Sequence, residues 1–75
     1  MPKLRRVSGA EAIRALERLG FVQVRQRGSH VVLKRQTPDG EVGCAVPLHR
    51  ELAIGTLQSI LRQAKVTPDE FMENF

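Results

Sequence analysis

The feature that most constrains the fold is an alternation of apolar and polar residues between Phe21 and Val46. A period of two is typical of half-buried β-strands. Two turn signals interrupt it. One is Gly28-Ser29, and the other is Thr37-Pro38-Asp39-Gly40, where proline fixes one dihedral angle and glycine accepts a positive one. The pattern therefore predicts three antiparallel strands joined by two hairpins in series.

The middle strand, which begins at His30, alternates without a break. Val31 and Leu33 fall on one face of it, because side chains of a strand alternate between the two faces of a sheet. The other face carries His30, Val32 and Lys34. If the apolar pair meets the core, the imidazole and the lysine project from an uncovered face.

The first strand is irregular, since Phe21 and Val24 have opposite parity. A β-bulge near Arg25 would reconcile them, because a bulge inserts one extra residue into the strand. Arg25 and Arg27 are then the candidates to join His30 on the open face.

Helices flank the strands. Ser8 and Glu11 have the spacing of a capping box, and Gly20 can take the left-handed conformation that ends a helix, so we expect a helix from Gly9 to Leu19. A second apolar helical face runs from Thr56 to Ala64.

The remaining signals concern where elements end. Pro47 should end the third strand, and Thr67-Pro68 should begin a short last helix that carries Phe71. The order is α-β-β-β-α with a terminal helical turn. It predicts an α+β sandwich in which helices cover one face of a three-stranded antiparallel sheet.

Length limits what such a fold can hold. With 75 residues the chain should be one domain spanning 1–75. A domain of this size buries only about 60% of the surface that its unfolded chain exposes, so we expect a modest core and no deep pocket for a cofactor or other small-molecule ligand.

The charge is divided unevenly along the chain. Residues 1–36 hold nine basic and two acidic side chains, whereas residues 37–75 hold three basic and six acidic ones. The basic half suits an anionic partner, which could be a nucleic acid, an acidic protein or a lipid surface. Charge alone does not choose among them, and a solvated surface would give the same composition.

Cys44 is the only cysteine, so neither an intramolecular disulfide nor a cysteine-based zinc site can form, and we interpret it as a small core residue. His30 and His49 are too few for a metal site made by the protein alone. No apolar run has the length of a membrane span, and no signal peptide is evident at the N-terminus. These observations favour a cytoplasmic protein.

The sharpest functional pattern is Arg25-Gln26-Arg27-Gly28-Ser29-His30. Histidine accepts and returns a proton near neutral pH, and nearby cations can hold a phosphate and stabilise the charge that develops on it. A base beside a phosphate clamp suggests RNA cleavage, because RNA carries its own nucleophile, the 2′-hydroxyl. This chemistry requires no metal.

A plainer interpretation of the same residues stays open. The histidine could be an ordinary surface residue at the start of a strand, and Gly28-Ser29 could be only a hairpin turn. The cations could protect a strand edge from aggregation. His49, within Leu48-His49-Arg50, could cap the second helix, contact the backbone or serve as a second acid.

Four segments together resemble the HicA toxins of bacterial type II toxin-antitoxin systems. They are Leu19-Gly20-Phe21, Arg25 to His30, Val46-Pro47-Leu48-His49 and Gly55 to Leu61. The resemblance implies a fold like the double-stranded RNA-binding domain. It also implies a ribonuclease that cleaves messenger RNA, free or on ribosomes, and halts translation.

Carried over to this sequence, the family pattern makes His30 the catalytic histidine, with Gly28 and Ser29 shaping the turn that presents it. We expect Arg25, Arg27, Gly28, Ser29 and Lys34 to contact RNA, without a cofactor. The usual partner is a HicB antitoxin, which could cover the basic face. The family pattern says less about His49, for which a structural role is favoured and a second acid-base role is a hypothesis.

Two other classes of function compete. A non-catalytic module could bind duplex RNA through shape, 2′-hydroxyls and phosphates, although the lysine cluster that such modules place at their second helix is missing here. A protein that only binds an acidic partner would leave the Gly-Ser-His placement unexplained. With three Phe, no Tyr and no Trp, we expect little stacking on bases, weak sequence preference and salt-sensitive binding.

Overall fold

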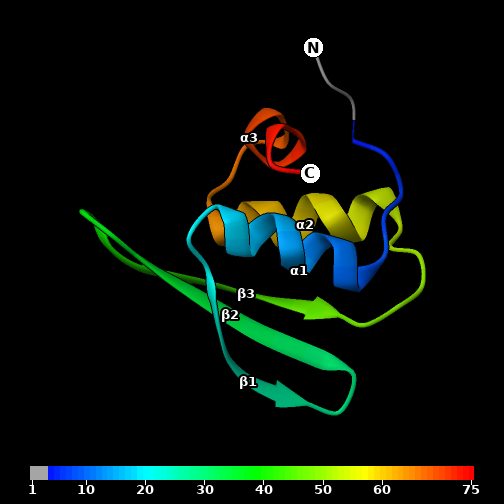
Figure 1. The fold of residues 1–75 in the computed structure, drawn as a ribbon, viewed down its shortest axis with the longest axis horizontal. Coiled ribbons are helices and arrows are strands. Elements are labelled where there is room, and N and C mark those ends of the chain that lie inside the picture. Colours follow the sequence, from blue (N-terminus) through cyan, green and yellow to red (C-terminus); the bar gives the residue numbers. More distant parts are fainter. Residues whose placement is uncertain (1–3) are drawn as a thin grey trace.

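The computed structural model describes residues 4–75. Its elements are α1 (Gly9–Arg18), β1 (Val22–Arg27), β2 (His30–Thr37), β3 (Gly40–Pro47), α2 (Ile54–Ala64) and α3 (Pro68–Glu73). The strands form one antiparallel sheet in the order β1-β2-β3. The predicted α+β order is therefore confirmed, and the fold is that of a double-stranded RNA-binding domain (Figure 1).

Most predicted boundaries are confirmed within one or two residues. The first helix ends at Arg18 instead of Leu19, and the second begins at Ile54 instead of Thr56. β3 ends at Pro47, as the sequence predicts. The predicted bulge is also present, because Gln23 pairs with Leu33 and Arg25 with Val32, which leaves Val24 as the extra residue.

Both predicted helix caps form. The Ser8 hydroxyl accepts from the N–H of Glu11 at 3.0 Å, and the Glu11 carboxylate accepts from the N–H of Ser8 at 2.9 Å. This second bond lowers the pKa of the Glu11 carboxyl. Thr67 and Glu70 repeat the arrangement at α3. Each box satisfies amides that the first helical turn leaves without partners.

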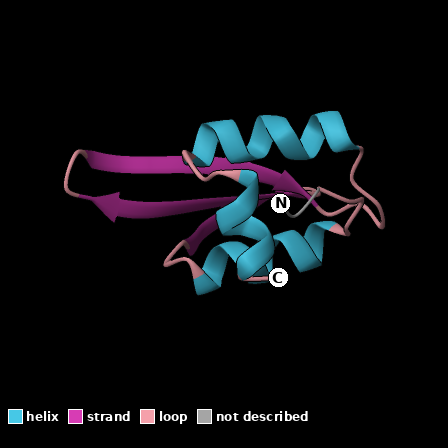
Figure 2. Cartoon of the chain, turned by 90° about the horizontal axis from the view of Figure 1, so that it is seen from above, coloured by secondary structure: helices cyan, strands magenta, loops and turns pink. Residues whose placement is uncertain are grey.

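The helices lie on one side of the sheet, and α3 packs over α1 and α2 on the side away from the strands (Figures 1 and 2). One hydrophobic cluster fills the space between the layers, with Leu33 and Val46 from the strands, Leu16 and Leu57 from the helices, and Phe71 from α3 all fully buried.

The cover over the sheet is incomplete. Every residue of β1 is exposed, whereas β2 and β3 bury alternate residues against α1 and α2. The β2–β3 hairpin also extends beyond the helices at its Thr37–Gly40 turn (Figure 2). The helices therefore protect two strands, and the third forms an exposed edge.

The basic N-terminal tip falls partly outside the described residues, which begin at Leu4. Leu4 packs on the core, the Arg5 guanidinium lies 5.1 Å from the ring centre of Phe75, and Arg6 lies 3.8 Å from Glu51. Two of the N-terminal cations thus have partners within the fold.

The start of α1 lies directly against the end of β3. The N–H of Gly9 donates to the carbonyl of His49 at 2.9 Å, and a Cβ at Gly9 would collide with the carbonyl oxygen of Pro47. Only glycine fits this close backbone approach.

Because Gly9 lies against backbone atoms and Gly55 has open space around it, the two glycine-to-alanine changes should have opposite effects on stability. Gly9→Ala should lower the free energy of unfolding by about 1 to 3 kcal/mol, because backbone atoms must move apart. Gly55→Ala should raise it by about 0.5 to 1 kcal/mol, because Gly55 lies in α2 with open space around it and alanine favours the helix. Urea unfolding of the two variants measures both effects. Equal stability of the Gly9→Ala variant and the parent would contradict the close approach.

Candidate functional site

His30 is the first residue of β2 and its side chain is exposed. Its Cα partners in the sheet are Arg27 on β1 and Pro47 on β3. Directly opposed residues of an antiparallel pair point to the same face, so Arg27 and His30 stand side by side on the face away from the helices. Arg25 follows on the same face, opposite Val32. The structure therefore brings these two arginines and the histidine together, as the sequence predicts.

The turn before His30 is held from both sides. Gly28 has a positive φ of 56°, the left-handed region that favours glycine. The Gln26 side chain donates to the Gly28 carbonyl at 2.9 Å, and the Ser29 carbonyl accepts from the N–H of Leu48 at 2.6 Å. Gly28 and Ser29 are thus placed to shape the presentation of His30.

Most cations of the basic half have partners within the protein. Arg18 donates to the carbonyls of Asn74 and Phe75, and Arg35 donates to the Leu19 carbonyl while lying 4.8 Å from the ring centre of Phe21. These side chains join helices to strands and to the C-terminal turn. Their charge is used for the fold.

Arg25 and Arg27 differ from that group. Within residues 4–75, neither guanidinium has a salt bridge, a side-chain hydrogen bond or a cation–π contact. Both are exposed, and both face the same side as His30. Two guanidinium groups without protein partners beside an exposed imidazole form a surface that suits a phosphate diester.

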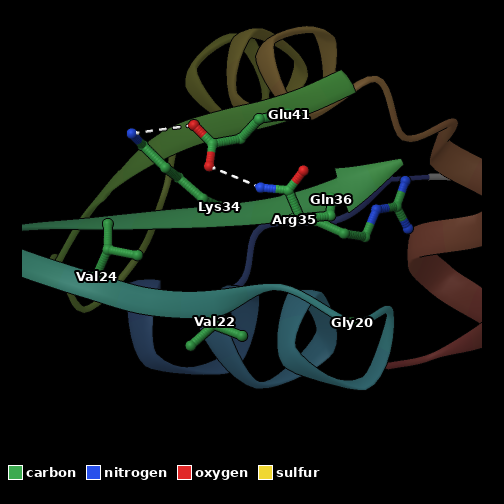
Figure 3. A pocket seen from close by; sticks show the side chains of 7 residues that line it. All are labelled: Gly20, Val22, Val24, Lys34, Arg35, Gln36 and Glu41. Carbon is green, nitrogen blue, oxygen red and sulfur yellow. Dashed lines mark hydrogen bonds and ion pairs between the residues drawn. The ribbon is translucent and has the colours of Figure 1, made fainter. Parts of the chain in front are cut away.

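Lys34 is placed differently from the other predicted contacts. It lies on the His30 face but four residues along β2, about 13 Å away at the usual rise of a strand. Its Nζ is 3.2 Å from Oε1 of Glu41, and Gln36 donates to the other carboxylate oxygen at 3.0 Å (Figure 3). Lys34 is therefore neither beside His30 nor without a partner.

His49 has its side chain in solvent, two residues beyond the Pro47 that pairs with His30. Its carbonyl accepts the Gly9 N–H. It does not cap α2, whose N-cap residue is Ala53 without a side-chain hydrogen bond. This contact is made by the backbone and does not depend on the imidazole, so the role of the His49 side chain stays a prediction.

Cys44 is buried between the sheet and the helices, opposite Leu33. Burial raises the pKa of its thiol to about 11, because an apolar environment disfavours the thiolate. It is a core residue, as expected. Over the described part of the chain, no three His, Cys, Asp or Glu side chains come together as a metal site would require, and no helix is long and apolar enough to cross a membrane.

Sequence reasoning missed Glu41 and Gln26. The signal for Glu41 was present, because the Pro38-Asp39 turn sets Thr37 opposite Gly40 and hence Gln36 opposite Glu41. Pairing the residues of the two strands one by one from this turn would have placed the Glu41 carboxylate near Lys34. The Gln26 contact depends on a local side-chain conformation, which no spacing reveals.

Fold and site define a small α+β protein of the double-stranded RNA-binding-domain type with a basic, uncovered sheet face. The family model described as "HicA toxin of bacterial toxin-antitoxin" matches residues 9–66, which is 58 of the 75 residues. The chain therefore belongs to the HicA toxin family, and it is a toxin of a toxin-antitoxin pair. No curated protein matched its sequence.

The burial of Cys44 predicts an unreactive thiol. An aromatic disulfide reagent at pH 8 should label the urea-unfolded chain at least about 100-fold faster than the native protein, because only the unfolded thiol ionises readily. Since the unfolded chain loses this proton at lower pH than the native one, stability should also fall as the pH rises from about 9 towards 11. A Cys44→Ala control should lack that part of the decline. Rapid labelling of the native protein would contradict the assignment.

Proposed function

We propose that this toxin is a metal-independent endoribonuclease that cleaves messenger RNA, free or on the ribosome, with His30 as the catalytic residue. The observation that carries the proposal is the placement of His30 beside Arg25 and Arg27, neither of which has a protein partner among the described residues. Family membership supports a ribonuclease in general terms.

The proposed reaction uses the substrate's own 2′-hydroxyl. His30 acts as the general base and takes the proton from this oxygen, which attacks the adjacent phosphorus. The bond from phosphorus to the 5′-oxygen of the next nucleotide breaks in line, and that oxygen leaves with a proton supplied by solvent. The products are a 2′,3′-cyclic phosphate and a 5′-hydroxyl.

Arg25 and Arg27 supply the electrostatic part of this mechanism. Negative charge builds on the non-bridging oxygens as the phosphorus becomes five-coordinate, and the two guanidinium groups can donate hydrogen bonds to these oxygens. Gly28 and Ser29 form the turn that precedes His30, and this exposed turn can approach the RNA backbone. The reaction draws on no cofactor.

The same sheet face would bind both proposed partners. A HicB-type antitoxin with acidic groups could cover the face that RNA needs, so that antitoxin and RNA could not bind at the same time. The proposed location is the cytoplasm, where the toxin would encounter both messenger RNA and antitoxin. Contacts to the RNA backbone dominate this proposal, which agrees with the weak sequence preference expected from the few aromatic residues.

Passive binding of duplex RNA is the second candidate, and one observation weighs against it. The N-terminal half of α2, from Ile54 to Ile60, holds no cation, whereas Arg62 and Lys65 come only at its end. The phosphate contacts that such modules make with the start of this helix would be missing. Arg25 and Arg27, by contrast, lie on β1 beside His30.

Removing the imidazole should remove cleavage without unfolding the protein. The His30→Ala variant, assayed on single-stranded RNA in EDTA, should be at least about 100-fold slower than the parent, which is the usual size of a general-base contribution. Its melting temperature should stay close to that of the parent, because the side chain is exposed. Equal cleavage by both proteins would contradict the proposed role. Binding without cleavage by either would favour the passive module.

His49→Ala is the matched histidine control. Its carbonyl, which contacts Gly9, survives the substitution, so the fold should be kept. We expect cleavage close to that of the parent, in contrast to the loss of about 100-fold that removal of a general acid causes. A loss of that size with unchanged stability would instead establish a second acid-base role for His49.

A further inference from the structure

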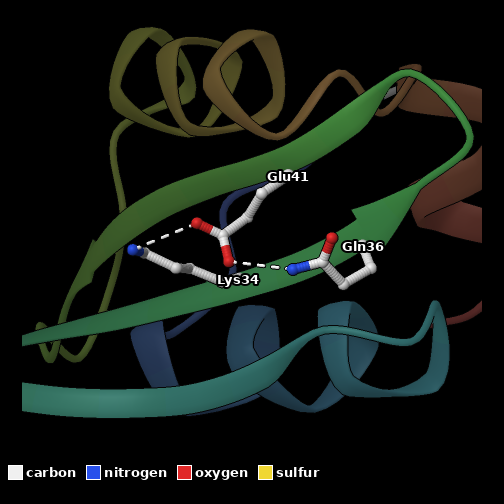
Figure 4. A network of polar contacts seen from close by, with 3 residues as sticks. All are labelled: Lys34, Gln36 and Glu41. Atoms are coloured by element: carbon white, nitrogen blue, oxygen red, sulfur yellow. Dashed lines mark hydrogen bonds and ion pairs between the residues drawn. The ribbon is translucent and has the colours of Figure 1, made fainter.

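The half of the open sheet face farthest from His30 holds a compact polar network. Glu41 on β3 is the Cα partner of Gln36 on β2, and Lys34 lies two residues along the same strand. One carboxylate oxygen is 3.2 Å from the Lys34 ammonium and the other accepts from Gln36 at 3.0 Å (Figure 4). Both oxygens of Glu41 are therefore engaged within the protein.

The network borders a hollow on the surface. Val22 and Val24 of the exposed strand β1 form its apolar side, and Lys34, Gln36 and Glu41 form its polar side (Figure 3). The two valines are 62% and 50% exposed, unusually high values for this residue type. Lys34 lines this hollow, so a ligand group that enters it can approach the ammonium.

Glu41 is a negatively charged side chain on a face whose other charged side chains are positive. The register puts Arg25, Arg27 and Lys34 on it with His30, and in the described strands Glu41 is the one carboxylate among them. Its position next to the third cation divides the face into two parts. Near His30 the cations are unpaired, and at the far end the cation is neutralised.

The Lys34–Glu41 pair is weak enough to exchange. Both side chains are almost half exposed, at 46% and 47%, and ion pairs in such surroundings contribute little because water and salt screen them. A phosphodiester of the RNA backbone carries the same single negative charge as the carboxylate, shared by two non-bridging oxygens. It can therefore replace Glu41 at the ammonium, at the cost of repulsion from the displaced carboxylate.

We propose that Lys34 is a second phosphate-binding site for the RNA strand and that Glu41 occupies this site in the free protein. The proposal rests on the proposed function and extends it, since the same strand would pass His30 at one end of the face and reach Lys34 about 13 Å away. Glu41 then lowers the affinity for RNA and keeps the tightest phosphate contacts at the His30 end. Lys34 is a binding residue only after this exchange.

The test measures binding of a single-stranded RNA whose 2′-hydroxyls are methylated, so that it binds without being cleaved. Glu41→Gln should tighten binding about threefold to tenfold at low salt. It should also steepen the plot of log Kd against log salt by about 0.7, the value for one more contact to a single strand. Glutamine can still accept the Gln36 hydrogen bond, so the hairpin should be unaffected.

Three controls distinguish a phosphate site at Lys34 from a general effect of net charge. Glu73→Gln makes the same change in net charge at an exposed position of α3 and should leave both quantities unchanged. Lys34→Gln alone leaves the charge of Glu41 without its partner and should weaken RNA binding. The double variant Lys34→Gln/Glu41→Gln, in which both side chains are neutral, should bind RNA about as the parent does. A polyglutamate competitor should gain less than RNA from Glu41→Gln, since a carboxylate matches the group that it would replace.

The outcomes are distinct. If the parent binds and cleaves RNA but Glu41→Gln behaves like Glu73→Gln, the second site is overturned and the proposed function stands. The second site is also overturned if the double variant Lys34→Gln/Glu41→Gln binds RNA as tightly as Glu41→Gln does, or if the gain is seen only with polyglutamate. If neither the parent nor the variant binds RNA, the proposed function fails as well.

Discussion

The site depends on a set of backbone hydrogen bonds at one corner of the molecule. There the carbonyl of His49 accepts from Gly9, and the N–H of Leu48 donates to Ser29. These bonds tie the start of α1, the exit from β3 and the turn before His30 into one unit. Because every member is backbone, the corner stays in place whatever the exposed side chains do, which is what a catalytic group at the surface requires.

The two faces of the sheet have different surroundings. Val31 and Leu33 point into the core beneath the helices, and their neighbours on β2 point outward. Within residues 4–75 no helix covers that outer face, and β1 has neither side buried. In a chain this small, one face of the sheet packs in the core and the other is left for a ligand. α3 adds to the core from the far side of α1 and α2 (Figure 1).

Local rules explain why so much was predictable. The capping box at Ser8, the Pro-Gly turn and the alternation in β2 act over a few residues, and the structure keeps all three. The bulge at Val24 was predictable from a conflict of parity. The limits come from side chains that interact across the fold. Whether a cation stays available depends on partners far along the chain, as with Arg18 and the C-terminal carbonyls, and no spacing predicts them.

The central claim is that the uncovered face carries out RNA transesterification through the 2′-hydroxyl. The chemistry of the new RNA ends tests it most directly. After cleavage of a defined single-stranded RNA in EDTA, mass spectrometry should find 2′,3′-cyclic phosphate and 5′-hydroxyl ends, because the attacking oxygen belongs to the substrate. Fragments with 3′-hydroxyl and 5′-phosphate ends would mean that water is the nucleophile, and would contradict the role given to His30.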